Sequence, residues 1–301
     1  MASMGRKMAI AATLVFAPAL TIGCGASSRN SPPPTGNASA IANDDEAVSG
    51  LMEHHRFHHH GGVTLFIAMS LDTLGVSPER QAALERIRGD LLDRMDPARV
   101  AEQKLAATLA DGIAAGSIDA VKVDADVAQV TAAAVRVPDE SAGPLNELHA
   151  LLTPPERAAI VDKIEAHWAV WLATNADESG PKSPERGHLA ALTAELGLSA
   201  DQVDTIRAGL RGTMKTVPRI DRPEIAAHLR AFDDAFRGEA FDAKSFTTAS
   251  ADHASLVGWG AAQMAHFVET VTPVLTPDQR TKLAQRLREH ATHDPSAQRE
   301  P

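Results

Sequence analysis

An internal repeat constrains the fold of this chain more than any other feature of its sequence. The segment 74–77 (Leu-Gly-Val-Ser) recurs 122 residues later as 196–199 (Leu-Gly-Leu-Ser). The segment 152–157 (Leu-Thr-Pro-Pro-Glu-Arg) recurs 123 residues later as 275–280 (Leu-Thr-Pro-Asp-Gln-Arg). Because the spacing between the paired motifs agrees to one residue, we infer that a whole folding unit was duplicated.

The repeat defines the organisation of the chain. We call residues 61–174 the first repeat and residues 186–293 the second repeat. The full prediction is a signal peptide at 1–23, a lipidated Cys with a disordered tether and a His-rich tract at 24–60, the first repeat at 61–174, a linker at 175–185, the second repeat at 186–293 and a disordered tail at 294–301.

The paired motifs predict where helices begin. Ser or Thr stands three positions before Gln or Glu, and an apolar pattern with helical period follows, which is typical of a capping box. Apolar stripes such as Leu84, Ile87, Leu91 and Met95 extend the pattern, and no segment alternates like a strand. We therefore predict an all-α fold of two tandem four-helix units. The motif residues are Thr153 with Glu156, Ser199 with Gln202, Thr276 with Gln279, and Ser77, whose box is incomplete because Arg80 follows it.

A Leu-Thr-x-x-Gln motif near each end of a short helical unit resembles the Spy/CpxP family. Gln202 and Gln279 match this motif, whereas Arg80 and Glu156 depart from it in the first repeat. The resemblance implies a periplasmic chaperone or envelope-stress protein that binds unfolded or misfolded clients without ATP. Members similar to Spy form a four-helix cradle, usually as a homodimer, so the tandem units are expected to form a homodimer or an internal pseudo-dimer. The net charge of this chain is acidic, whereas the resemblance implies a client-binding cradle with a basic surface.

The amino terminus predicts export and lipid anchoring. Arg6 and Lys7 precede an apolar run at 9–22 that is short for a membrane span and typical of a secretory signal. The run ends in Leu-Thr-Ile-Gly before Cys24, which resembles a lipobox, so we expect cleavage before Cys24 and acylation of that residue. By resemblance to known sorting rules, Gly25 favours the outer membrane. The tether would give a flexible reach of about 30–40 Å.

Composition excludes several classes of function. The chain has 301 residues, a net charge of −10 and a single cysteine, so no disulfide is expected and nucleic acid is an unlikely partner for so acidic a chain. Removal of Arg6 and Lys7 with the signal would make the charge two units more negative. We found neither a nucleotide-binding loop nor any of the catalytic motifs that we sought, so the chain is not expected to be an enzyme.

Histidines and carboxylates supply the alternative hypotheses. A tract before the first repeat carries His54, His55, His58, His59 and His60. On a helix, pairs four residues apart share a face and can bind Zn²⁺, Cu²⁺ or Ni²⁺. A heavy-metal binding or sensing protein is therefore the alternative function, and a soluble linker without a metal role is the simpler interpretation of the tract. No cofactor is expected to be required.

Other polar and aromatic residues receive structural interpretations. The histidines within the repeats, including His149, are interpreted as helix-surface residues, and the carboxylates of Asp124/Asp126 and Asp233/Asp234 as parts of solvated faces. Six large aromatic side chains of the second repeat are alternatives for a client-binding surface, and a core position is the preferred interpretation for most of them. They are Phe232, Phe236, Phe241, Phe246, Trp259 and Phe267.

Overall fold

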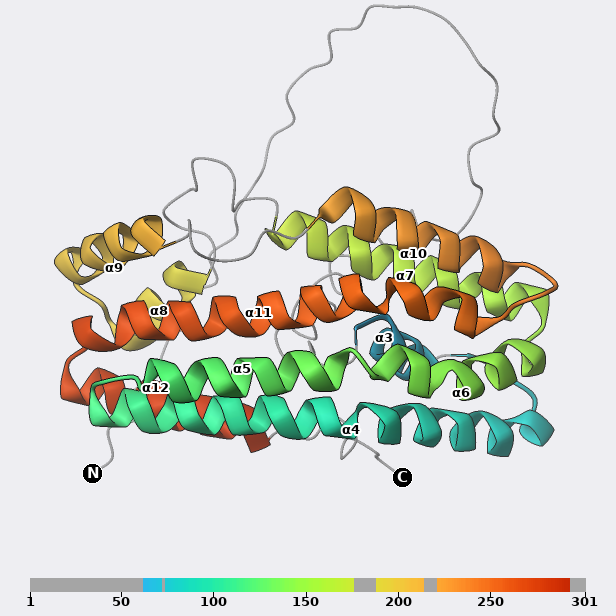
Figure 1. Ribbon diagram of the computed structural model, residues 1–301, viewed down its shortest axis with the longest axis horizontal. Coiled ribbons are helices and arrows are strands. Elements are labelled where there is room, and N and C mark those ends of the chain that lie inside the picture. Colours follow the sequence, from blue (N-terminus) through green and yellow to red (C-terminus); the bar gives the residue numbers. More distant parts are fainter. Residues whose placement is uncertain (1–61, 72–73, 176–187, 214–220, 293–301) are drawn as a thin grey trace, which may run out of the picture. The chain divides into compact units, whose positions relative to one another are not determined.

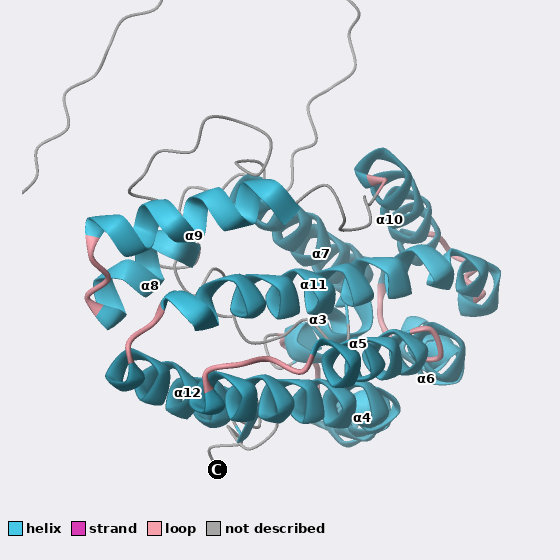
Figure 2. Cartoon of the chain, turned by 60° about the vertical axis from the view of Figure 1, so that its left-hand side comes forward, coloured by secondary structure: helices cyan, strands magenta, loops and turns pink. Residues whose placement is uncertain are grey.

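The protein is built from helices throughout its described part. The computed structural model describes residues 62–71, 74–175, 188–213 and 221–292, and none of these residues lies in a strand (Figure 2). The all-α prediction is thereby confirmed for this part of the chain. All of the described helices fall within one compact unit, Gly36–Pro301.

The first repeat contains five α-helices where the sequence predicts about four. α5 and α6 are separate helices, because α6 begins at Val137 and Pro138 follows as a residue without an N–H to continue the hydrogen-bond ladder of α5. The helices are α3 (Gly62–Ser70), α4 (Pro78–Ala115), α5 (Ala120–Ala134), α6 (Val137–Leu151) and α7 (Pro154–Asn175) (Figure 1).

Two helices of the second repeat begin at positions equivalent to helix starts of the first repeat. Ala200, which starts α9, corresponds to Pro78, and Pro277, which starts α12, corresponds to Pro154. The span that forms the single helix α4 in the first repeat is divided between α9 and α10 in the second. The elements are α8 (His188–Leu196), α9 (Ala200–Thr213), α10 (Arg222–Arg237), η3 (Ala243–Ala249), α11 (Ser250–Val271), η4 (Thr272–Val274) and α12 (Pro277–Thr292).

Local sequence explains how α4 ends and α5 begins. Gly116 follows α4 with φ of 79°, and its N–H bonds back to Gly112 and Ile113. This left-handed conformation favours glycine because it has no Cβ. The Asp119 carboxylate then accepts a hydrogen bond from the backbone N–H of Lys122 and caps α5.

Three apolar clusters hold the helices together. The first joins α3, the amino-terminal half of α4, α6 and α7, and it contains the predicted stripe Leu84, Ile87, Leu91 and Met95, each at most 2% exposed. The second joins the carboxy-terminal half of α4 with α5, α11 and α12. The third joins α8 and α9 with Val271 and Leu275. The burial of the predicted stripe is confirmed.

Two of the three clusters combine residues of both repeats. Phe232, Phe236 and Ala243 of the second repeat complete the first cluster, whereas α4 and α5 of the first repeat complete the second cluster. Accordingly, α12 packs along α4 and α11 packs along α5 (Figure 1). Part of the burial of apolar side chains in these two clusters therefore comes from contact between the repeats.

None of the described helices combines the length and the apolar character that crossing a bilayer requires. Cys24, the tether, the His-rich tract, the tail and all of the linker except Asn175 lie outside the described residues.

Candidate functional site

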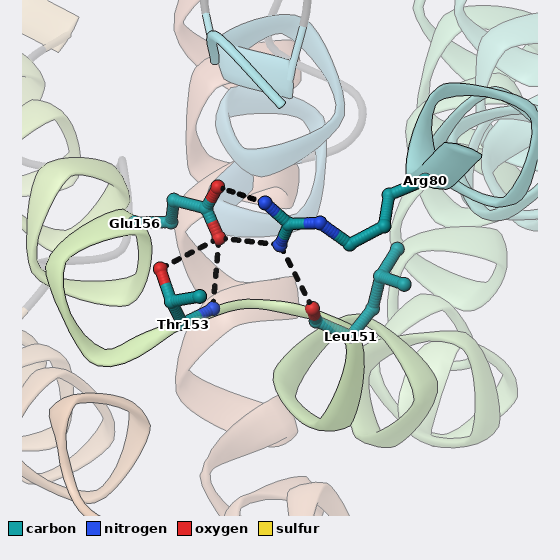
Figure 3. A network of polar contacts seen from close by, with 4 residues as sticks. All are labelled: Arg80, Leu151, Thr153 and Glu156. Carbon is teal, nitrogen blue, oxygen red and sulfur yellow. Dashed lines mark hydrogen bonds and ion pairs between the residues drawn. The ribbon is translucent and has the colours of Figure 1, made fainter. Parts of the chain in front are cut away.

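The two motif positions of the first repeat meet in an ion pair. The Arg80 guanidinium donates to both carboxylate oxygens of Glu156, with N–O distances of 2.8 and 2.7 Å (Figure 3). Arg80 Nη1 also donates to the carbonyl oxygen of Leu151 at 3.2 Å. Arg80 thereby ties the start of α4 to the end of α6 and to the first turn of α7.

The carboxylate of Glu156 also organises the start of its own helix. The backbone N–H and the hydroxyl of Thr153 both donate to Glu156 Oε2 at 2.8 Å (Figure 3). The hydrogen bond from Arg80, and secondarily those from Thr153, lower the pKa of Glu156 to about 2 against the opposing effect of burial. Glu156 is therefore a carboxylate held by donors from two separate segments.

The equivalent positions of the second repeat meet through amide groups. Gln202 Nε2 donates to Gln279 Oε1 at 2.8 Å and to the carbonyl oxygen of Val274 at 2.9 Å. Val274 is the repeat counterpart of Leu151, so Gln202 makes the same two contacts as Arg80. Gln279 Nε2 in turn donates to the carbonyl oxygen of Leu196 at 3.3 Å.

The same glutamines close the capping boxes of the second repeat. The backbone N–H of Ser199 donates to Gln202 Oε1 at 3.0 Å, and the N–H of Gln202 donates to Ser199 Oγ at 3.2 Å. Thr276 and Gln279 repeat this exchange at 2.9 and 3.4 Å. Ser77 caps α4 without a side-chain hydrogen bond to the helix backbone. In each repeat, the side chains three positions after the capping Ser or Thr therefore link two helix starts.

The pairing of Arg80 with Glu156 was missed by the sequence analysis, which treated Arg80 only as the residue that leaves its box incomplete. A signal was available in the sequence. The two positions that depart from Gln do so with opposite charges, and their counterparts Gln202 and Gln279 belong to the same motif. A basic and an acidic replacement at paired positions indicate compensation across a contact.

A line of apolar residues lies on the solvent face of α5 and ends at its C-cap residue, Val135. Its members are spaced by four and three residues in alternation, so they lie along one face of the helix. Val121 is 81% exposed and Val135 is 42% exposed, and the alanines between them are also exposed. We call this set the α5 line; it comprises Val121, Ala125, Ala128, Ala132 and Val135.

Four phenylalanines of α10, η3 and the segment between them lie at the first apolar cluster. Phe232 and Phe236 are buried, and Phe241 and Phe246 pack against them with ring centroids 5.0–5.9 Å apart. His149 of α6 stacks on Phe241 at 5.1 Å. We call these five residues the aromatic cluster.

The interpretation of His149 as a helix-surface residue was wrong. Its side chain is enclosed by the rings of Phe236 and Phe241, and Nε2 lies 3.0 Å from the carbonyl oxygen of Gly238. Burial, followed by the charge of Arg157, lowers the pKa of His149 against the effect of its backbone hydrogen bonds. Gly238 belongs to the second repeat, and the repeats pack in a way that helical periodicity alone does not reveal.

The solvated-face interpretation of the carboxylates was wrong for one member of each pair. Asp126 is 2% exposed at the contact of α4 with α5, where Thr108 donates at 2.6 Å and Lys104 forms an ion pair at 2.8 Å. Asp233 is 3% exposed, and its Oδ1 has no hydrogen-bond partner. Asp124 and Asp234 are exposed as expected.

Among the described residues, no group of three or more His, Cys, Asp or Glu side chains is arranged to hold a metal ion. The histidines proposed as ligands, His54, His55, His58, His59 and His60, lie outside the described residues, as does Cys24. The metal hypothesis therefore rests on the His-rich tract of the sequence.

Comparison of the chain with protein-family models, with curated proteins and with solved structures gave no match.

Proposed function

We propose that this protein is a lipid-anchored periplasmic chaperone or envelope-stress protein that binds unfolded or misfolded clients without ATP. The observation that carries the proposal is the pairing of the motif positions within each repeat, Arg80 with Glu156 and Gln202 with Gln279. Equivalent contacts at equivalent positions support a duplicated unit, and the motif of that unit is the one that resembles the Spy/CpxP family. These contacts between positions that are distant in sequence are evidence independent of the motif itself.

The α5 line is the client-binding surface that we propose. Client segments that have lost their fold expose apolar side chains, and exposed apolar patches on a folded protein commonly mark binding sites. The line combines this apolar character with charged neighbours, since Lys122 and Asp124 are also exposed on α5. By contrast, Phe232, Phe236 and His149 of the aromatic cluster are buried, and Phe241 and Phe246 are partly buried, so the cluster exposes less apolar surface in this state.

Suppression of aggregation tests this proposal. A chemically denatured client is diluted into buffer without ATP, and its light scattering is followed with and without the protein that lacks residues 1–23. We expect strong suppression at a several-fold molar excess, and unchanged scattering would contradict the proposed activity.

A matched pair of variants tests the proposed surface. The variant V121D/V135D places two carboxylates on the α5 line, whereas A82D/A150D places two carboxylates on other exposed helix positions. Only the first variant is expected to lose suppression, because only it places charge on the α5 line. Both variants change the net charge equally, so the second controls for charge alone. Equal loss in the two variants would indicate a general charge effect and would remove the α5 line from the proposal.

The lipid anchor is part of the proposal and has its own test. The full chain expressed in a bacterium that acylates lipoproteins should incorporate a labelled fatty acid, and Cys24→Ala should not. Incorporation into both proteins would exclude Cys24 as the lipidated residue. Fractionation of the envelope then reports whether the inner or the outer membrane holds the protein.

Binding of Zn²⁺, Cu²⁺ or Ni²⁺ is the second candidate function, and the density of histidines between His54 and His60 favours it. Calorimetric titration of the wild type and of a variant without the five histidines separates the two candidates. Binding that disappears with the tract would support a metal-binding protein, whereas equally weak binding by both would eliminate the tract as a site.

A further inference from the structure

The contact between α10 and α7 contains a buried carboxyl group whose own helix does not neutralise it. Arg237 lies one turn after Asp233 on α10, but its guanidinium pairs with α7 instead, reaching Asp162 at 2.6 Å and Glu165 at 2.8 Å. Asp233 is left 3% exposed with Oδ1 unpaired. A buried polar group without a partner is costly, and the cost is larger when the group is charged.

The internal repeat supplies a direct comparison for this contact. Asp233 corresponds to Ala110 of α4, Asp234 corresponds to Asp111 of α4, and Glu165 corresponds to Arg288 of α12. Asp111 and Arg288 form an exposed ion pair at 2.8 Å. At the equivalent contact of α10 with α7, the two positions are Asp234 and Glu165, and both carry carboxyl groups. One contact between the repeats therefore joins opposite charges, whereas its counterpart brings together like charges.

The charges around Asp233 come from both helices. Burial raises the pKa of Asp233 to about 7, with further increases from the carboxylates of Glu165 and Asp234, while Arg237 lowers it. Asp162 of α7 acts on the same group through its pairing with Arg237, and η3 contributes the exposed Lys244 to the surroundings of α10. Proton binding by Asp233 is therefore tied to the packing of α10.

We propose that Asp233 makes the contact of α10 with α7 proton-operated: a protonated carboxyl holds α10 in place in mildly acidic medium, and its ionisation loosens α10 as the pH rises to neutrality. Phe232 and Phe236 lie on α10 and contribute to the aromatic cluster. Loosening of α10 would consequently uncover apolar rings. If the proposed chaperone function holds, these rings are a second, pH-dependent surface for clients.

The sign and size follow from linkage. Asp233 in a released α10 regains an ordinary pKa near 3.8, so closed protein binds more protons than open protein between that value and about 7. Opening of α10 should become easier by up to about tenfold per pH unit across this window, and it should level off above it. His149 has the opposite sign, because its lowered pKa favours the neutral ring in the folded protein and acidification weakens its contribution.

Hydrogen exchange of the protein lacking residues 1–23, with rates corrected for intrinsic exchange, measures the opening. Between about pH 5 and about pH 7 we expect exchange in 222–237 to increase by up to about 100-fold. Asp233→Asn should abolish this increase, because an amide does not titrate. Asp111→Asn is the control at an exposed carboxylate near the end of α4, and it should retain the wild-type pH dependence. A flat wild-type profile, or an unchanged slope in Asp233→Asn, would overturn the inference.

Aggregation suppression, measured on the same proteins at the same pH values, separates this inference from the proposed function. pH-dependent exchange without any suppression would overturn the chaperone function and leave the proton-operated contact intact. Suppression together with exchange of 222–237 that does not depend on pH would overturn the contact alone. Glu165→Gln removes the like charge from α7, and its exchange should level off at a lower pH than that of the wild type.

Discussion

At the scale of single residues, the most informative feature is the replacement of a glutamine pair by an ion pair at equivalent positions. Arg80 and Gln202 each bind one side chain and one carbonyl oxygen, at Leu151 and Val274 respectively. Oppositely charged partners in a bidentate pair hold each other more strongly than two amides, but each charge depends on the other for compensation. A single substitution therefore removes more than one contact.

Conversion of the first repeat to the glutamine pair tests this dependence. Arg80→Gln and Glu156→Gln should each lower the urea midpoint of unfolding, because each leaves one charge without its partner. The double variant R80Q/E156Q should unfold at a midpoint closer to the wild type than either single variant. Additive losses in the double variant would contradict a coupled pair.

The pH dependence of stability has a defined window at Glu156. Its pKa falls from 4.5 in the unfolded chain to about 2 in the fold. Because the folded value is lower, the contribution is complete above pH 4.5 and is lost as the pH falls toward 2. Urea titrations across this window should show a steeper loss in the wild type than in Glu156→Gln.

The exposed pair of Arg86 with Glu147 provides the control for this measurement. Glu147 is 55% exposed, so its ion pair is screened by solvent. Glu147→Gln should therefore leave the steep acid loss of the wild type largely in place. An equal flattening in both variants would mean that Glu156 has no special role in acid sensitivity.

At the scale of elements, α4 is a continuous helix that passes from the first apolar cluster to the second despite an internal proline. Pro97 is exposed inside α4 and lies between the buried Met95 and the buried Leu105. A proline in a helix interior removes a backbone hydrogen bond and crowds the preceding turn. The burial of both halves of α4 is what compensates for that loss.

Substitution of this proline should therefore stabilise the protein. We expect Pro97→Ala to raise the free energy of unfolding by about 1–3 kcal/mol, because it restores the hydrogen bond and improves helix propensity. Pro78→Ala at the first turn of α4 is the control and should have little effect, since the first N–H groups of a helix lack partners anyway. Denaturant titration measures both, and equal shifts would contradict the argument.

The contact of α5 with α11 offers a second test at this scale. A Cβ on Gly258 would overlap the side chain of Thr131, whereas a Cβ on Gly260 would meet nothing within 4 Å. Gly258→Ala should destabilise the protein by about 1 kcal/mol, because the overlap exceeds the gain in helix propensity. Gly260→Ala should stabilise it by about 0.5–1 kcal/mol. Stabilisation by both substitutions would show that α5 and α11 are not closely packed at Gly258.

At the scale of the whole molecule, the two repeats depend on one another for their cores. The aromatic cluster takes His149 from the first repeat and its phenylalanines from the second, and the second apolar cluster also draws on both repeats. Burial of large apolar side chains supplies most of the stability of such a fold. Neither repeat alone can complete these clusters.

Separate expression of the two repeats tests this dependence. Residues 61–174 and 186–293 produced alone should show little cooperative thermal unfolding by circular dichroism, and a mixture of the two should recover part of it. Two fragments that each unfold cooperatively at the temperature of the full chain would show that the repeats are independent domains.

Much of the local structure was predictable because its causes lie within a few residues. Thr153, Ser199 and Thr276 mark helix starts through capping chemistry, and Leu84, Ile87, Leu91 and Met95 mark one buried helix face through their spacing. The positions of the carboxyl groups were less predictable. Asp126 and Asp124 are equally polar in sequence, yet only Asp126 is buried, because Thr108 and Lys104 of α4 lie opposite it.

By itself, the sequence determined that the described part of this protein is all-α, that it carries a duplicated motif, and where α4, α7, α9 and α12 begin, because periodicity, proline and capping act locally. Only the tertiary structure decided that Arg80 pairs with Glu156, that His149 and Asp233 are buried, and that the two repeats share their clusters. These features depend on which helix of one repeat lies against which helix of the other. The periodicity of a helix identifies the face that is buried, but it does not identify the partner that covers it.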